Sequence, residues 1–172
     1  MTKGTDQIVE TIQESGIRKT SLETSKLLVL GFLAGAYVGF GAQIATTVSI
    51  DAAQYLGVGA SKVLVGTVFS VGLMLVILGG AELFTGNCLI SLSVLGGKVK
   101  LAMLAHNWSI VYLGNLLGSV LLAYMIYNAG LYSMASNALG VTAITIANSK
   151  VNLSFTQAFF RGILCNWLVC LG

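Results

Sequence analysis

Residues Val63–Gly97 read VLVGTVFSVGLMLVILGGAELFTGNCLISLSVLGG, and this stretch decides how the chain folds. Between Lys62 and Lys98 these thirty-five residues carry a single formally charged side chain, that of Glu82. One continuous α-helix of that length would run roughly 50 Å at ~1.5 Å per residue, whereas the hydrocarbon core of a bilayer is about 30 Å thick. We therefore predict a membrane span that either tilts steeply or is interrupted.

The site of the interruption is predicted from the polar residues of the stretch. Gly79-Gly80 and Gly86-Asn87 bracket Ala81–Thr85, so that a carboxylate, a hydroxyl and an amide cluster where the glycines loosen the helix. Irregular backbone at membrane depth is tolerated only where it is buried in protein or lines a water-filled path, and half-helix ends that meet at the midplane build permeation sites. We interpret the stretch as a broken membrane helix lining a pore, with a non-helical segment over Leu83–Asn87.

The composition of the whole chain is that of an all-α integral membrane protein. The mean hydropathy is +0.88, with 56% hydrophobic and 9% charged residues among 172. The formal charge of +3 is small and the basic residues are not clustered, which argues against nucleic acid as a partner. The 21 glycines and the lack of proline fit membrane helices that pack closely.

The reactive residue types form no pattern that predicts a catalytic or metal site. The three cysteines, Cys88, Cys165 and Cys170, lie in apolar surroundings, and His106 is the only histidine. We interpret the cysteines as small buried hydrophobic residues. Because the sequence contains no nucleophile–base pair, metal-ligand cluster or phosphate-binding loop, we expect neither enzymatic activity nor a cofactor.

Residues 1–26 form a polar N-terminal segment in which apolar residues recur at helical spacing. Two readings remain open: an amphipathic helix lying on the membrane surface, or a membrane-entry helix that only anchors the chain. Basic residues gather before the first span and after the second, on one side of the membrane if the second span crosses fully. They are Lys3, Arg18, Lys19, Lys26, Lys98 and Lys100. The positive-inside rule puts that side, and the N-terminus, in the cytoplasm.

A membrane channel domain is predicted over residues 27–172. Its spans are expected at about 27–50, 63–97 (interrupted near 83–87), 107–128 and 153–172. Residues 51–62 are expected to form a short loop, and residues 131–152 an external loop that partly dips back. Glycines every four residues in the first span, Gly31, Gly35 and Gly39, predict a groove for another helix. Because the sequence stops within an apolar helix, we expect a piece of a longer protein.

Two motifs carry a resemblance to a known family. Ile77–Gly86 reads ILGGAELFTG, and Gly162–Gly172 reads GILCNWLVCLG. Both closely resemble the signature segments of the formate/nitrite transporter family, whose members include hydrosulfide channels. The motifs stand in the expected order, in spans two and four, with a lysine between them. Gly172 departs from the family pattern, which usually ends this motif with alanine.

The resemblance covers essentially the whole chain and implies a fold, an assembly and a location. Family members look like six-span subunits with an aquaporin-like inverted repeat and cytoplasmic termini. They assemble as homopentamers with one pore per subunit in the prokaryotic cell membrane. This chain would hold the first repeat and the start of the second. The family's fifth span, with its central His, is not in this sequence, and His106 is expected in a cytoplasmic turn.

The resemblance also assigns pore residues in and before the broken segment. Leu83, Phe84 and Thr85 match the loop that interrupts the second span and forms part of the inner constriction. Phe69 and Leu73 match an outer hydrophobic constriction. Without the motif these two would be read as residues facing lipid or the helical core.

Polar residues complete the predicted site. Lys150 matches a lysine of the outer vestibule, where it would attract anions, and Asn166 is the polar residue of the second signature. Glu82 is the acid of the first signature, with Asn87 beside it. Placing an acidic side chain at membrane depth costs free energy, so such a residue usually has a function or a charged partner. Two roles for Glu82 stay open: contact with the permeant, or a structural hydrogen bond tying the broken loop to Asn166 or Asn115.

The predicted function is passive or proton-coupled permeation of a small monovalent anion: formate, nitrite or hydrosulfide, also as the protonated acid. Protonation would remove the cost of moving a bare charge past apolar rings. One alternative is an aquaporin-like channel for neutral solutes, which is disfavoured because the break reads GAELFTGN and contains no Asn-Pro-Ala turn. The other is a structural membrane subunit without transport, which would require both signatures to be coincidental.

Overall fold

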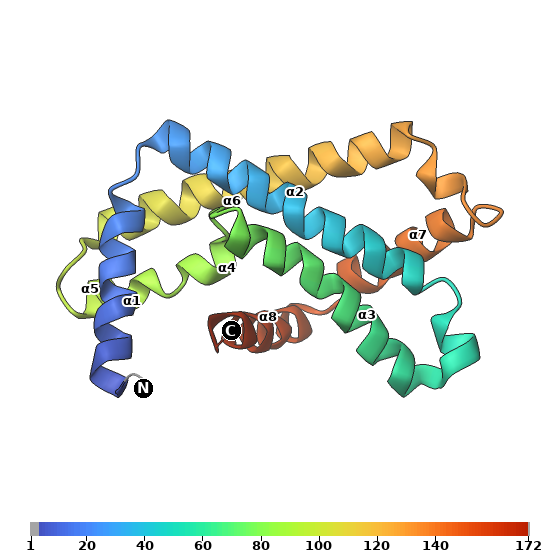
Figure 1. Cartoon of the computed structure of the whole chain (residues 1–172), viewed down its shortest axis with the longest axis horizontal. Coiled ribbons are helices and arrows are strands. Elements are labelled where there is room, and N and C mark those ends of the chain that lie inside the picture. Colours follow the sequence, from blue (N-terminus) through green and yellow to red (C-terminus); the bar gives the residue numbers. More distant parts are fainter. Residues whose placement is uncertain (1–3, 172) are drawn as a thin grey trace.

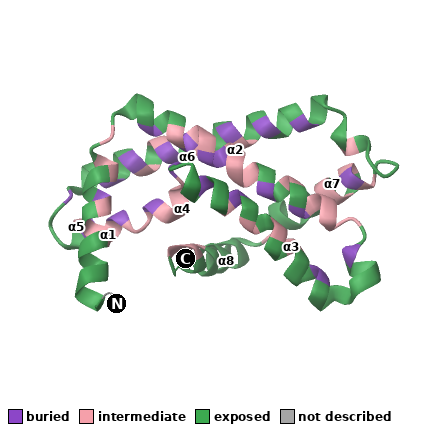
Figure 2. Ribbon diagram, in the orientation of Figure 1, coloured by how far each residue is buried: buried purple, intermediate pink, exposed green. Residues whose placement is uncertain are grey.

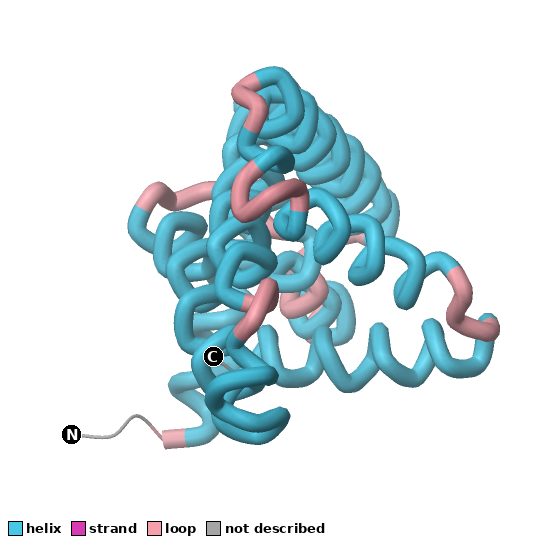
Figure 3. Tube along the Cα trace, turned by 90° about the vertical axis from the view of Figure 1, so that its right-hand side faces the viewer, coloured by secondary structure: helices cyan, strands magenta, loops and turns pink. Residues whose placement is uncertain are grey.

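The computed structural model describes residues 4–171, and the regular elements of that part of the chain are all helical (Figures 1 and 3). In chain order these are α1 (Thr5–Thr20), α2 (Thr24–Val48), α3 (Ala52–Leu78), α4 (Phe84–Asn87), α5 (Ile90–Leu95), α6 (Leu101–Asn128), the 3-10 turn η1 (Leu131–Ser133), α7 (Ala138–Val151) and α8 (Phe155–Leu171). Lys3 of the predicted cytoplasmic segment and Gly172 of the second motif lie outside the described residues.

Helices α2 and α6 run side by side, and α3 packs on α2 (Figure 1). The contact depends on glycine. A Cβ added at Gly35 would clash with the carbonyl of Asn115, and one added at Gly118 would clash with the carbonyl of Phe32. The backbones therefore approach too closely for any side chain, as small residues permit in membranes. The prediction that the glycine stripe of the first span receives another helix is confirmed.

The second long helix ends at Leu78, and the next helix begins at Phe84. Residues 79–83 are therefore the non-helical segment, and Gly80 has φ +61°, a left-handed conformation that glycine adopts without strain. The prediction of a non-helical segment over Leu83–Asn87 is wrong, because Phe84–Asn87 is a turn of helix. Of the three glycines that bracket this segment, Gly79, Gly80 and Gly86, only Gly80 has a positive φ, and Gly86 stays helical.

Two predicted loops are largely helical. Helix α3 already begins at Ala52 and passes through a kink at Gly57, whose φ is +73°. Residues 131–152 contain η1 and the helix α7, in which Leu139 is fully buried. Likewise α6 begins at Leu101, although the span was expected from residue 107. Hydropathy locates where a chain leaves the bilayer, whereas helical hydrogen bonds continue past that point.

Three helices within residues 4–171 are long and apolar enough to cross a membrane, judged by length and composition: α2, α3 and α6. Helix α8, which covers the predicted fourth span, is a shorter apolar helix of 17 residues. Buried residues concentrate along α2 and α6 and around α4, whereas α8 is exposed or half-buried (Figure 2). The chain thus forms one closely packed helix pair with more exposed apolar helices around it.

The polar N-terminal segment is the helix α1, and it lies against α5 (Figure 1). The Gln13 side chain donates to the carbonyl of Leu92 at 3.3 Å, and the Ser93 hydroxyl donates to the carbonyl of Gln13 at 3.0 Å. Gly16 is buried against Ser93. The sequence left two interpretations open, a helix on the membrane surface and a helix that anchors the chain. Neither included the packing of α1 on α5.

The glycine contact between α2 and α6 makes a stability prediction. Gly118→Ala places a methyl group against the Phe32 backbone, so we expect it to lower the free energy of unfolding by about 1–3 kcal/mol. Gly66→Ala is the matched control, since a Cβ there meets nothing within 4 Å and alanine favours a helix. The measurement is the thermal unfolding midpoint in detergent. Equal effects of both substitutions would contradict the close contact.

Candidate functional site

The non-helical segment is held by backbone hydrogen bonds to its neighbours. The Glu82 N–H donates to the Leu30 carbonyl of α2 at 3.2 Å. The Asn115 side chain of α6 donates to the carbonyls of Gly31 and Glu82, at 2.8 and 3.0 Å, and accepts from the Phe84 N–H at 3.0 Å. Three backbone groups at the interruption, the N–H and carbonyl of Glu82 and the N–H of Phe84, thus find partners in the protein, as a membrane interior requires. Asn115 is one of the two partners expected for the broken loop.

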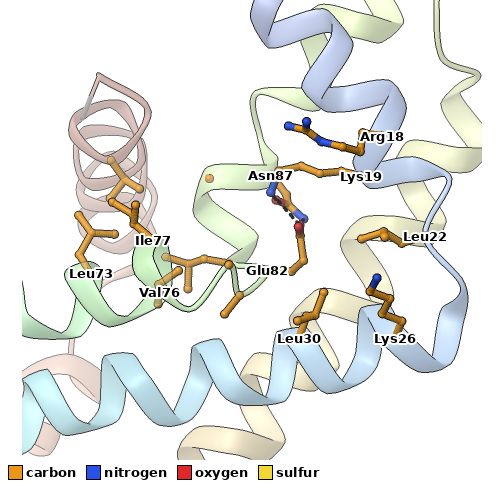
Figure 4. Close-up of a pocket in the computed structure, with 15 residues that line it drawn as sticks. Arg18, Lys19, Leu22, Lys26, Leu30, Leu73, Val76, Ile77, Glu82 and Asn87 are labelled. Atoms are coloured by element: carbon orange, nitrogen blue, oxygen red, sulfur yellow. Dashed lines mark hydrogen bonds and ion pairs between the residues drawn. The ribbon is translucent and has the colours of Figure 1, made fainter.

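The carboxylate of Glu82 lies in a polar network that we define by Lys19, Glu82, Asn87 and Asn107. Glu82 is 6% exposed, and its Oε2 accepts from Lys19 Nζ and from Asn87 Nδ2, each at 2.8 Å (Figure 4). Lys19 Nζ also donates to Asn87 Oδ1 at 2.9 Å. Asn87 Nδ2 donates to Asn107 Oδ1 at 2.9 Å, and Asn107 Nδ2 to the Lys19 carbonyl at 3.2 Å. Every member therefore bonds to at least two others.

The polar network leaves no buried polar side chain without a partner. Throughout residues 4–171, each buried side-chain nitrogen or oxygen has a hydrogen-bond partner. Lys19–Glu82 is the one ion pair of this part of the chain. Buried charges that are paired and hydrogen-bonded avoid most of the desolvation penalty. The arrangement supports the structural role of Glu82, but through Lys19 and Asn87 and not through Asn166.

Sequence reasoning missed Lys19 and Asn107 as members of the network. A lone acid in an apolar stretch signals that a cation must lie nearby. The chain offers nine lysines and arginines, however, and Lys19 is 63 residues from Glu82 along the sequence. Asn107 was taken only as the start of a span.

Aromatic residues fix the helix that follows the interruption. The ring of Phe84 makes edge-on contacts with Trp108 and Tyr112, with centroids 5.8 and 5.5 Å apart. Trp108 Nε1 donates to the Asn87 carbonyl at 3.0 Å. Phe84, predicted as a constriction residue, is half-buried against α6. Its contacts anchor α4, and such aromatic pairs add stability beyond their buried area.

A cavity of about 670 Å³ opens beside the interruption (Figure 4). Its apolar lining includes Leu73 of α3, Leu83 of the broken segment and Val169 of α8, and its polar lining includes Glu82 and Asn87. The predicted residues Leu73, Leu83, Glu82 and Asn87 are thus brought together. A space with an apolar wall and a few polar groups is typical of binding sites for small molecules.

The remaining predicted residues lie elsewhere. Asn166 Nδ2 donates to Cys170 Sγ at 3.7 Å, and this thiol donates to the Thr85 carbonyl at 3.5 Å, so one cysteine joins the two signatures. Phe69 is 41% exposed and does not line the cavity. Lys150 is exposed in the last turn of α7 and is also absent from the cavity wall.

Comparison with known proteins gives the family. The sequence pattern described as "Formate/nitrite transporter" matches residues 6–172. The chain belongs to the formate/nitrite transporter family. The resemblance read from the two signature segments is therefore confirmed, and the helices described above are those of a multi-pass membrane protein.

Curated members of the formate/nitrite transporter family are similar over most of this chain. A "Probable formate transporter" of Methanothermobacter thermautotrophicus is 40% identical over 169 residues, covering 89% of this chain and 61% of that protein. "Formate channel FocA" of Escherichia coli (strain K12) is 34% identical over 162 residues, covering 92% of this chain and 55% of that protein. The chain spans about three fifths of the length of these relatives.

Solved structures of formate/nitrite transporters share the fold. A "Pentameric formate channel with formate bound" superposes with a TM-score of 0.75 at 36% identity, covering 86% of this chain and 58% of that chain. An "FNT family ion channel" superposes with a TM-score of 0.82 at 30% identity, covering 96% of this chain and 66% of that chain. The all-helical arrangement is thus that of the family's channels.

The ion pair predicts a strong effect of Lys19 on the stability of this formate/nitrite transporter. Lys19→Met leaves the buried Glu82 carboxylate without its cation, so we expect a loss of about 3 kcal/mol in the free energy of unfolding. Lys19→Met combined with Glu82→Gln should recover part of that loss, because no charge then remains buried. Denaturant titration in detergent measures both.

Lys150→Met is the control for the ion-pair prediction, since Lys150 is exposed and its ammonium makes no bond within the described residues. It should leave stability unchanged. If Lys19→Met and Lys150→Met behave alike, the ion pair does not hold the broken segment in place.

Proposed function

We propose that this member of the formate/nitrite transporter family conducts small monovalent anions across a membrane: formate, nitrite or hydrosulfide, as the anion or as the protonated acid. The observation that carries the proposal is the cavity beside the interrupted helix, where apolar side chains meet cationic and amide groups. The name of the similar solved structure, a formate channel with formate bound, supports the choice of anion.

The lining of the cavity suits a weak acid. Cationic side chains raise the local concentration of anions and favour their entry. The apolar wall opposes passage of a bare charge, since desolvating an ion is costly, and protonation in the pore removes that cost. Thr85 and Asn166 do not line the cavity, but the Thr85 hydroxyl makes no hydrogen bond within residues 4–171, and we assign it to the permeant, with Asn166 nearby.

We further propose that the chain is the first repeat and the start of the second in an aquaporin-like inverted repeat, with the interruption near the membrane midplane. Residues 1–26 then form the cytoplasmic segment and residues 27–172 the channel domain. Contacts between His106 and Thr24, at 3.1 Å, and between Gln13 and Leu92 support this orientation. They bring the basic residues before α2 and those near residue 100 to one end of the molecule (Figure 1).

A homopentamer in a prokaryotic cell membrane is the proposed assembly. The similar solved channel is named as pentameric, and the similar curated proteins come from bacteria and an archaeon. Helices α3 and α8 expose large apolar side chains such as Leu78 (86% exposed) and Phe155 (84% exposed). These suit contact with neighbouring subunits and lipid.

Formate uptake into liposomes tests the proposed function. The full-length protein should carry formate and nitrite down their gradients, and Lys150→Ala should lower the uptake rate several-fold at low salt, because a cation at the outer mouth concentrates anions. Lys150→Arg should retain part of the rate. Equal uptake rates for wild type and Lys150→Ala would show that Lys150 does not attract the anion.

The choice of solute tests the alternative functions. Uptake of urea or glycerol without formate would favour the neutral-solute channel, and uptake of none of these solutes would favour a structural subunit.

The outer hydrophobic constriction gives a second prediction. Phe69 and Leu73 lie four residues apart on α3 and share one face of the helix. Replacing both by alanine should widen an apolar collar, so that larger or more strongly hydrated anions pass faster than in wild type. Uptake of acetate and lactate relative to formate measures the change. An unchanged ratio in a stable pentamer would place the constriction elsewhere, and loss of the pentamer would assign these side chains to packing.

A further inference from the structure

Helix α8 meets the rest of the chain through one narrow face. Its half-buried residues are Asn166, Val169 and Cys170, whereas all others in Phe155–Leu171 are exposed. Spacings of three and four residues place these side chains on one side of the helix. Helix α8 packs against α4, and Val169 also lines the cavity. The second signature segment therefore meets the first at the edge of the cavity.

The carbonyl of Thr85 is a group that α4 itself pairs only weakly. In a continuing α-helix it would accept from the N–H of Leu89, but that N–H donates to the Gly86 carbonyl at 3.2 Å. The N–H of Cys88 reaches the Thr85 carbonyl at 3.4 Å, beyond the usual range of such bonds. Helix ends leave carbonyls without a partner, and the interior of a membrane offers no water to replace it.

Cys170 supplies a second donor to this carbonyl. Its Sγ donates to the Thr85 carbonyl at 3.5 Å, and Nδ2 of Asn166, one turn earlier in α8, donates to the same Sγ at 3.7 Å. A thiol is both a weak donor and a weak acceptor. Because the Asn166 amide occupies an acceptor position of the sulfur, the S–H proton is directed at the carbonyl.

The neighbours of Thr85 within α4 are fixed to α6. The Phe84 ring packs edge-on against Trp108, and the Asn87 side chain is buried in the polar network. Thr85 stands between them, half-buried, and is tied to α8 through the Cys170 thiol. This single turn of helix is thus held from two sides, and the contact from α8 acts on the backbone that carries the Thr85 hydroxyl.

We propose that Cys170 is a positioning residue for permeation: by donating to the Thr85 carbonyl, it orients the Thr85 hydroxyl toward the permeant. This inference rests on the proposed function, which assigns that hydroxyl to a small carboxylate or oxyanion. Gly86 and Val169, the chain neighbours of Thr85 and Cys170, line the cavity, so the contact lies beside it. Fixing the backbone directs the hydroxyl, because the branched threonine side chain has few rotamers.

The S–H stretching band of the full-length protein tests the contact itself. A thiol that donates a hydrogen bond absorbs at a lower frequency than one that does not, in a spectral region free of other protein bands. Infrared spectra should show a lowered band that Cys170→Ala removes. Cys165, on the same helix, is exposed and makes no hydrogen bond within residues 4–171, so Cys165→Ala should remove an unshifted band. A Cys170 band at the Cys165 frequency overturns the proposal.

Formate uptake into liposomes tests the positioning role. Cys170→Ala should lower the uptake rate about threefold, the scale of one weak hydrogen bond, whereas Cys170→Ser retains a donor and should keep most of the rate. Thr85→Val removes the hydroxyl and keeps the branched shape of the side chain. If Cys170 acts through Thr85, adding Cys170→Ala to Thr85→Val should cause no further loss. Cys165→Ala is the matched control and should leave the rate unchanged.

The outcomes separate positioning from packing and from the proposed function. The same loss from Cys170→Ala in the Thr85→Val background overturns the positioning role and assigns Cys170 to packing, while formate transport stands. Equal losses in Cys170→Ser and Cys170→Ala also overturn it, since serine retains the donor. A wild-type protein that carries no formate overturns the proposed function, and the positioning role with it, even where the S–H band is lowered.

Discussion

The pairing of one buried carboxylate organises this structure. Glu82 stands in the interruption between α3 and α4, where a charge without a partner would be prohibitively expensive. Its cation is supplied by α1 and its amide partner, Asn87, by α4, and Asn107 of α6 in turn bonds to Asn87. A polar helix from the start of the chain is thereby fixed against apolar helices that follow much later, and the cavity lies between them.

A second constraint, the pairing of backbone groups at the interruption, depends largely on Asn115. Asn115 bonds α2, the non-helical segment and the first residue of α4 at once. It can reach all three because Gly35 lies directly against its backbone: a Cβ at Gly35 would clash with the Asn115 carbonyl. The close packing of α2 and α6 therefore supports the interruption. If the two helices lay further apart, the Asn115 side chain could not bond to Gly31 of α2 and to the non-helical segment at once.

Features that depend on residues close together in the sequence could be predicted from it. Hydropathy and spacing identified the helical membrane class, the glycine stripe and an interruption in the second span, and two short motifs identified the family. The exact segment was missed because the sequence does not reveal which of several glycines takes the left-handed conformation, here Gly80. The partner of Glu82 was missed because it depends on tertiary contacts across 63 residues. The helices over residues 52–62 and 138–151 were missed because weak apolar character does not distinguish a loop from a short helix.

The link between Asn107 and Lys19 has a consequence for biogenesis. The amide donates to the carbonyl of a residue made 88 positions earlier. At translation rates of about 5–20 residues per second, the N-terminal helix waits on the order of ten seconds before α6 exists to receive it. Until Asn107 is made, the polar network lacks one of its four members. Helix α1 can therefore make all of its contacts only after α6 has been synthesised.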